Sequence, residues 1–147
     1  MRLDITVIGR PAPQGSHGLG SAGQFLDASP YLAAWRRAVK IGAYQAYRQA
    51  GLSASLPVFP AGTPVTVERC TFYVDREQCR AAGTDEPVGD PDIDKLLRAT
   101  LDALGGAKKE TARLFADDAQ VVAIRDLSKT RAMADPGALI IVSDGRD

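Results

Sequence analysis

Residues 65–74 read Val-Thr-Val-Glu-Arg-Cys-Thr-Phe-Tyr-Val, and they give the clearest indication of a β-strand in this 147-residue chain. Such β-branched and aromatic side chains favour a pleated strand. Residues 2–8 alternate apolar and polar side chains with a period of two, which predicts another strand. Residues 121–127 and 138–142 also read as strands. The nearly continuous apolar character of 138–142 predicts a central position in a sheet or cover on both faces.

Two helices are expected between these strands. The first runs over about residues 30–50, opened by Ser29-Pro30 and stopped by Gly51, with a buried face of Leu32, Trp35, Val39, Ala43 and Ala46. The second covers about 92–104, with a buried stripe of Ile93, Leu97, Thr100, Leu101 and Leu104. The order β-α-β-α-β-β predicts a single α/β domain over residues 1–147, with a mixed sheet of about four strands and helices packed on it.

Composition excludes several classes of protein. The chain is 45% hydrophobic and 24% charged, which argues against collagen-like, coiled-coil and disordered proteins. No apolar run reaches the roughly 18 residues of a membrane span, and the start has no signal core, so we expect a cytoplasmic protein with no membrane partner. Two cysteines without CxxC spacing and a single histidine disfavour a tetrahedral zinc site. Any bound metal must therefore be held by oxygen.

Charge is segregated along the chain although the net charge is zero. Residues 1–50 carry six basic side chains against two acids, whereas residues 75–94 carry seven acids against two basic side chains. One side of the first helix is expected to gather Arg36, Arg37, Lys40 and Arg48, with Tyr44 and Tyr47 between them. Such a face is typical of DNA binding, and the plainer alternative is a solvated helix surface.

A glycine- and proline-rich segment over residues 9–23 predicts a long loop. Loops of this length in a small domain are usually functional or disordered. Arg10 and His17 lie in it among backbone amides that could meet phosphate. The alternative is a mobile surface segment.

The first acidic motif, residues 89–104, crowds Asp90, Asp92 and Asp94 at the start of the second helix, and capping explains only one of them. Two residues apart within a helix means about 200° of rotation, so Asp92 and Asp94 converge on one cation only if Asp92 lies at or before the cap. The competing arrangement has Asp90 as N-cap and Pro91 in the first helical position. A surface ion-pair ladder is the plain explanation for the four-residue spacing of Asp94, Arg98 and Asp102.

The second acidic motif, residues 114–122, places Asp117 and Asp118 just before a strand. Adjacent acids are common in turns, but together with the first motif they form a plausible open site for a hard ion such as Mg²⁺. A carboxylate-bound ion suits phosphodiester hydrolysis, because it activates water and neutralises charge on the phosphate. Arg98 or Lys95 would add a protein cation, and Lys129 is a more distant candidate.

These residues resemble a known family. The motif Pro91-Asp-Ile-Asp-Lys-Leu-Leu-Arg-Ala-Thr-Leu-Asp-Ala-Leu104, followed by Asp117-Asp-Ala-Gln-Val-Val122 and then Lys129, resembles the RusA family of Holliday junction resolvases. Weaker likeness is found in residues 9–15 and 34–38. The resemblance spans most of the chain and is strong over about residues 90–130.

The resemblance implies a homodimeric endonuclease that depends on Mg²⁺, with Mn²⁺ as a substitute ion, and places symmetric nicks in a four-way DNA junction. It implies that Asp92, Asp94 and Asp118 bind the metal, with Asp117 as the accompanying acid. Arg98 would offset charge at the scissile phosphate. The side chains expected to contact DNA are Arg10, His17, Arg36, Arg37, Lys40, Lys95 and Lys129.

The chain also departs from the family pattern. Lys95 stands where the family commonly has Asn, and Arg98 stands where it commonly has Lys. Arginine offers a planar fork and does not give up a proton. The spacer over residues 106–113 also looks longer than usual. These departures leave two alternatives open: a degenerate relative that grips branched DNA without cutting it, and a domain whose carboxylates serve only capping and solubility.

Overall fold

The computed structural model describes residues 1–14, 18–19, 25–26, 30–52, 57–80, 86–89, 91–106 and 113–146. The strands of the main sheet are β1 (Arg2–Ile8), β4 (Val65–Val74), β5 (Val121–Ile124), β6 (Leu127–Arg131) and β7 (Gly137–Ser143). Two short strands, β2 (Gly18–Leu19) and β3 (Phe25–Leu26), form a separate antiparallel pair. The helices are α1 (Leu32–Gln49), α2 (Arg76–Arg80) and α3 (Ile93–Gly105), with a 3₁₀ turn η1 (Asp118–Gln120) before β5.

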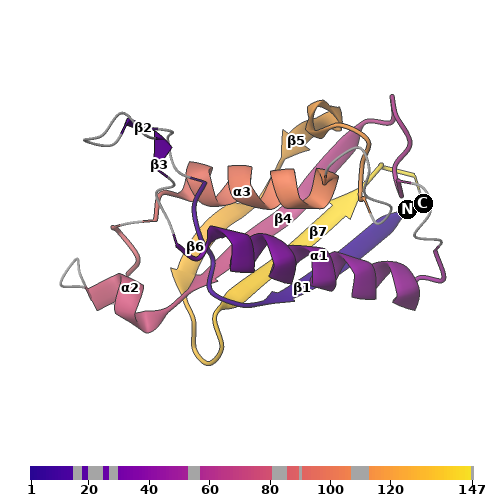
Figure 1. Cartoon of the computed structure of the whole chain (residues 1–147). Helices are drawn as coiled ribbons and strands as arrows, with labels where there is room; N and C mark the ends of the chain where they lie inside the picture. Colours follow the sequence, from indigo (N-terminus) through magenta and orange to yellow (C-terminus); the bar gives the residue numbers. More distant parts are fainter. Residues whose placement is uncertain are drawn as a thin grey trace.

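The main sheet is mixed, in the order β1-β7-β4-β5, and β6 also pairs with β4 (Figure 1). The apolar strand β7 lies between β1 and β4, in the central position that its composition predicts, and it is antiparallel to both. Both β5 and β6 run parallel to β4. Two backbone hydrogen bonds span the break between β5 and β6. Arg125 N–H donates to Val67 O at 3.0 Å, and Cys70 N–H donates to Asp126 O at 2.7 Å. The strand expected at 121–127 is therefore shorter, and β5 and β6 follow one another along the same edge of β4. The predicted α/β class is confirmed.

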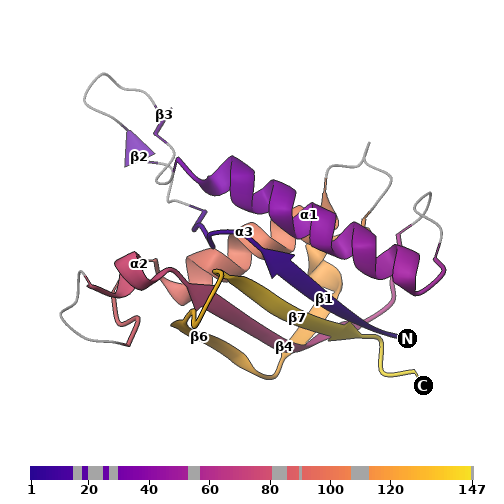
Figure 2. The same ribbon diagram turned by 90° about the horizontal axis from the view of Figure 1, so that it is seen from below.

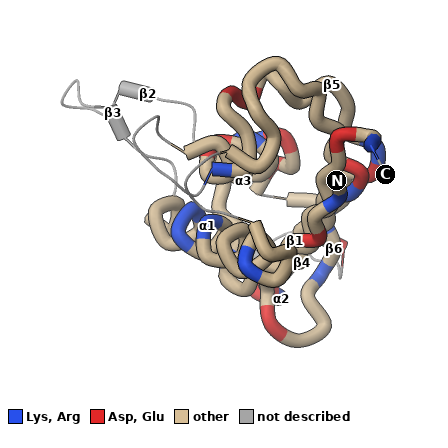
Figure 3. Tube along the Cα trace, turned by 90° about the vertical axis from the view of Figure 1, so that its right-hand side faces the viewer, with Lys and Arg blue, Asp and Glu red and all other residues tan. Residues whose placement is uncertain are grey.

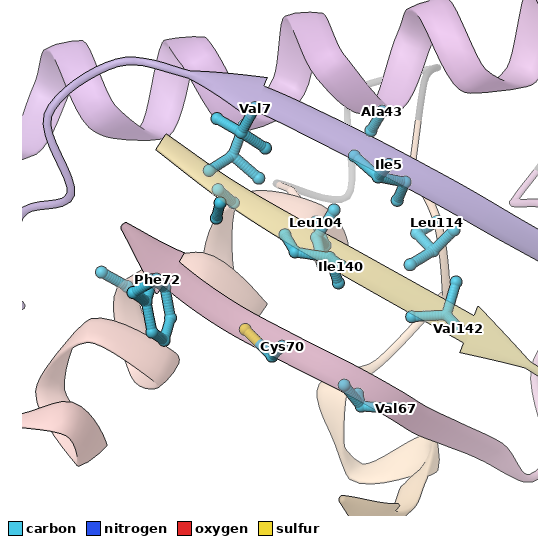
Figure 4. Close-up of a cluster of buried hydrophobic side chains, with 14 of the residues drawn as sticks. Ile5, Val7, Ala43, Val67, Cys70, Phe72, Leu104, Leu114, Ile140 and Val142 are labelled. Atoms are coloured by element: carbon cyan, nitrogen blue, oxygen red, sulfur yellow. The ribbon is translucent and has the colours of Figure 1, made fainter. Parts of the chain in front are cut away.

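Both long helices lie on one face of the sheet (Figure 2). Strand β1 turns Leu3, Ile5 and Val7 toward them and leaves alternate residues exposed. Inward side chains of β1, β4 and β7 meet α1 and α3 in one apolar core (Figure 4). No helix in the described part of the chain is long and apolar enough to cross a membrane.

Helix α1 starts later than expected and buries two residues more, Gly42 and Tyr47. It begins at Leu32 after Tyr31, so the start predicted at Ser29-Pro30 is wrong, and Ser29 itself lies outside the described residues. The predicted buried face is confirmed. Tyr47, however, is only 1% exposed. Its expected place among surface basic side chains is wrong, because position 47 lies one turn beyond the buried Ala43 and shares its side of the helix.

Helix α3 is rotated relative to the predicted stripe. Its buried residues are Leu96, Ala99, Thr100, Ala103, Leu104 and Gly105, whereas Ile93, Leu97 and Leu101 are half-buried. Alanine contributes weakly to a hydrophobic pattern, yet its small side chain allows close packing against α1. The contact is fixed by the Trp35 indole N–H, which donates to Thr100 Oγ1 at 3.1 Å in the core.

Two segments expected to be irregular contain short regular elements. Helix α2 lies within the stretch 75–89, and β2 lies within the loop 9–23. A five-residue helix and a two-residue strand are too short to produce a periodic pattern in sequence.

Gly42 sets the distance between α1 and β1. A Cβ atom at this position would lie 2.5 Å from the backbone oxygen of Thr6. Helix propensity alone makes Gly-to-Ala favourable by about 1 kcal/mol, but this clash is with a strand that is fixed in the sheet. We expect Gly42→Ala to lower the free energy of unfolding by about 1–3 kcal/mol, measured by urea denaturation. Gln45→Ala, on the exposed side of the same helix, is the control and should change it by less than about 0.5 kcal/mol.

Candidate functional site

The start of α3 presents Asp92 with an extended backbone. Asp92 is the N-cap residue, with φ −66° and ψ 139°. The helix does not begin with Pro91, so the competing arrangement is not adopted. Among the described residues, the Asp92 carboxylate makes no capping hydrogen bond. It lies 3.4 Å from the Lys95 ammonium. The backbone condition for Asp92 and Asp94 to share a cation is therefore met, while Asp90 lies outside the described residues.

A charged row follows on the outer side of α3. Asp94 and Arg98 are exposed, and Asp102 is half-buried. Figure 3 shows both signs of charge on α3, whereas α1 carries mainly basic bands. The row meets α1 at its far end, where Arg36 Nη2 lies 3.8 Å from Asp102 Oδ2.

The second acidic motif is held by Gln120, whose side chain is buried. Its amide oxygen accepts from the backbone N–H groups of Ala116 at 2.9 Å and Asp117 at 3.0 Å. Its amide nitrogen donates to three carbonyl oxygens of the loop before β4: those of Phe59 at 3.3 Å, Pro60 at 2.8 Å and Thr63 at 3.1 Å. One side chain therefore fixes the Asp-Asp turn to a segment 57–61 residues earlier in the chain.

The two acids of this turn have different surroundings. Asp117 is the N-cap of η1, and its Oδ1 accepts from Ala119 N–H at 2.9 Å. Asp118 is exposed. The pKa of Asp118 is raised by partial desolvation, by a hydrogen bond with Asp117, and by the negative charges of Asp102 and Asp117, against a lowering hydrogen bond from Ala119. Asp118 therefore lies within electrostatic range of helix α3.

Turn η1 thus contacts α3 near Asp102 rather than near the start of the helix. Asp94 and Asp102 are eight residues apart, or about 12 Å along the helix axis. Among the described residues, no three Asp, Glu, His or Cys side chains form a group that could hold a metal ion. The convergence of Asp92, Asp94, Asp117 and Asp118 on one ion stays a prediction, and Arg98 lies between the two ends of the row.

Arg36 of α1 lies beside this acidic row and is joined to the segment after β1. Arg36 donates to Gln14 Oε1 at 2.9 Å, and Gln14 N–H donates to the Lys95 carbonyl at 3.1 Å. The segment after β1 therefore lies over the first half of α3. Arg10, at the start of that segment, stacks over the Tyr31 ring at 4.3 Å.

The remaining basic residues are distributed differently. Arg37 lines a groove of about 370 Å³ between β1 and α1 and so lies on another side of the helix from Arg36. Lys40 is half-buried. Lys129 lies at the start of α3, where its ammonium donates to the carbonyls of Gly89 and Pro91. His17 lies outside the described residues, so its predicted DNA contact is untested.

Two positions gain importance from the structure. Gln120 has a local signal in sequence, because its three-residue spacing from Asp117 is that of a capping box. Asp102 appears in sequence only as one member of the ladder on α3, and its closeness to Asp118 depends on the fold. The three carbonyl oxygens that Gln120 also binds lie 57–61 residues earlier in the chain, and nothing in the sequence indicates those contacts.

The sequence matches no protein-family model and no curated protein. The geometry of its own residues is therefore what supports a function. The likeness of residues 91–129 to RusA resolvases remains an interpretation of motifs.

The Gln120 contacts predict a strong response to a single-atom change. Gln120→Glu replaces the donor that serves three carbonyls with a carboxylate oxygen. We expect the free energy of unfolding to fall by about 1–3 kcal/mol at pH 7, because the carboxylate oxygen that replaces the amide nitrogen would face three carbonyl oxygens. The introduced carboxyl should have a raised pKa in the folded state, so the deficit should shrink as the pH falls toward about 4.

The measurement is urea denaturation of wild type and variant at matched pH values. The control is Gln45→Glu on the exposed side of α1, which should change stability by less than about 0.5 kcal/mol. Equal effects at the two positions would show that the Gln120 contacts do not fix the turn.

Proposed function

We propose that this protein is a Mg²⁺-dependent, structure-specific endodeoxyribonuclease that resolves four-way DNA junctions as a homodimer. The observation that carries the proposal is the packing of η1 against α3. This contact joins two acidic motifs that are separated in sequence into one exposed surface. A structural role alone accounts for Asp117 as a cap, but it leaves Asp92, Asp94 and Asp118 without a capping function.

The donor chemistry of this surface fits a hard divalent ion. Carboxylate oxygens are the ligands that Mg²⁺ prefers, together with water, and Mn²⁺ accepts the same set. The residues that would hold the ion are Asp92, Asp94, Asp117 and Asp118. A bound ion supplies charge neutralisation at the phosphate and activation of water.

The protein's own cations would position and stabilise the DNA. Arg98 is exposed between the acids, where its guanidinium can offset charge on the scissile phosphate. Arg36 lies beside Asp102 on the same surface, and Arg10 belongs to the segment that Gln14 joins to α3. Both would hold neighbouring phosphates. A two-fold dimer with one site per subunit would cut two strands of like polarity at equivalent points.

A second function has its own supporting observation. The described acids do not form a closed metal-binding group, and Arg98 replaces the lysine common in the resembled family. Both features favour a protein that binds branched DNA without cutting it. Incubation of a labelled four-way junction with and without Mg²⁺ separates the two functions, since binding in EDTA without a metal-dependent nick indicates the binder.

The nuclease proposal predicts that Asp94→Asn and Asp118→Asn each lower the rate of junction cleavage by about 10²–10³-fold. Junction affinity in EDTA should stay equal or become tighter, because a charge that repels phosphate is removed. The measurements are single-turnover cleavage and gel-shift titration. Asp135→Asn, in the turn between β6 and β7, is the control and should cleave at the wild-type rate. Parallel loss of folding in the first two variants would instead show that these acids are structural.

The DNA-facing role of α1 predicts an altered salt dependence. We expect Arg36→Gln with Lys40→Gln to weaken junction binding and to make the slope of log K against log salt shallower by roughly 0.9 for each phosphate that is no longer neutralised. Glutamine avoids the repulsion that an acid would suffer beside Asp102. Arg2→Gln is the control, because Arg2 lies on β1 and pairs with Asp4. An unchanged slope in the double variant would remove this part of α1 from the DNA surface.

A further inference from the structure

The ammonium of Lys129 is tied to the backbone just before α3. It donates to the carbonyl oxygens of Gly89 at 2.8 Å and Pro91 at 2.9 Å, and the side chain is half-buried. An ammonium has three donors, so two of them are directed to the backbone on either side of position 90. Lys129 therefore connects strand β6 to the segment from which Asp92 projects.

Helix stability does not explain this placement. A cation near the N-terminus of a helix opposes the helix dipole, which favours negative charge there. Pro91 is buried and has no N–H to donate, so its carbonyl is the only backbone polar group that residue can pair. Lys129 satisfies that carbonyl and the carbonyl of Gly89 at once. The position of Lys129 is therefore best explained by its hydrogen bonds to the backbone before α3.

The held segment determines how Asp92 is presented. Pro91 leads directly into the extended conformation of Asp92, with ψ at 139°. That conformation keeps the Asp92 carboxylate outside the helix, and the carboxylate is not used for capping. Release of the two carbonyls would allow the backbone before Asp92 to rotate and to redirect the carboxylate.

A direct phosphate contact is the alternative role for Lys129. Its ammonium is already occupied by two carbonyls at short distances, whereas Arg98 on the same surface is exposed. A lysine that reached for phosphate would have to break these bonds or act through its one remaining donor. The geometry favours a role within the protein.

We propose that Lys129 is a positioning residue that holds the carbonyl groups of Gly89 and Pro91 so that the Asp92 carboxylate is held ready for a divalent ion. This inference rests on the proposed function, in which Asp92 is a metal ligand. Lys129 itself contacts neither the ion nor the DNA. Its role would be that of an outer contact that orients a ligand, and removal of such a contact typically weakens metal affinity by 10–100-fold.

The test compares Lys129→Met with Lys95→Met. Both changes remove one positive charge close to Asp92, which by electrostatics alone should tighten the binding of a cation. We expect Lys95→Met to bind Mn²⁺ as tightly as wild type or more tightly, because the Lys95 ammonium competes with a cation for the Asp92 carboxylate at the surface. Lys129→Met should bind Mn²⁺ at least tenfold more weakly, because the orientation of Asp92 is lost. Free Mn²⁺ is measured by electron paramagnetic resonance, with the metal alone as the probe.

Two further readouts separate positioning from other roles. Junction binding in EDTA should keep its salt slope in Lys129→Met, whereas removal of a phosphate-binding charge would flatten the slope by roughly 0.9. Lys129→Arg keeps the charge and N–H donors that can reach the two carbonyls, and should recover part of the Mn²⁺ affinity. Amide hydrogen exchange over residues 88–96 should become faster in Lys129→Met, with the rest of the described sheet unchanged.

Unaltered or tighter Mn²⁺ binding by a folded Lys129→Met protein would overturn the proposal, and so would a flattened salt slope. If wild type neither binds Mn²⁺ nor cuts a junction, the proposed function has failed. Hydrogen exchange then decides the positioning role by itself: faster exchange at residues 88–96 supports it and unchanged exchange overturns it. If Lys129→Met unfolds, Lys129→Arg is compared with wild type by the same measurements. Tenfold weaker Mn²⁺ binding by Lys129→Arg, with hydrogen exchange equal to that of wild type, would contradict the positioning role.

Discussion

Close packing of α3 against α1 and the sheet determines which side chains face outward from this helix. Leu96, Ala99 and Ala103 are all at most 3% exposed, so rotation of the helix would bring apolar surface into water at about 25 cal/mol per Å². The bond from Trp35 to Thr100 also fixes the rotation, since a buried indole N–H needs a partner. With that side buried, positions four residues apart on the opposite side must form an exposed row.

The acidic motifs are then placed by polar links to the backbone at the two ends of α3. Gln120 fixes the Asp-Asp turn to the loop before β4, and Lys129 fixes the segment before Asp92 to β6. Both side chains satisfy carbonyl groups in irregular segments, where secondary structure supplies no partner. Such links hold the acids through the backbone and leave the carboxylates available for ligands.

Sequence patterns predict those parts of the fold that depend on local periodicity. The strand at 65–74, the central strand and both long helices follow from the spacing of apolar residues, and the two acidic motifs follow from their composition. The capping box of Gln120 has a sequence signature in its spacing from Asp117. The contacts of Gln120 with the loop before β4, and those of Lys129, could not be predicted, because these partners are backbone atoms of distant residues. The burial of Tyr47 is different: its spacing from Ala43 already indicates the buried side, although its place among the basic residues of the helix suggested the surface.

The acidic row is partly neutralised by the protein itself. Lys95 lies 3.4 Å from Asp92, and Arg36 lies 3.8 Å from Asp102. Partly exposed pairs of this kind contribute at most about 1 kcal/mol, which is little compared with the attraction of a carboxylate for a divalent ion. A metal ion bound by Asp92 would break the ion pair between Asp92 and Lys95. The Lys95 ammonium would then be unpaired beside the segment that contains Arg10 and Gln14. Binding of metal and binding of phosphate would then favour each other, because the cation released by the first is available to the second.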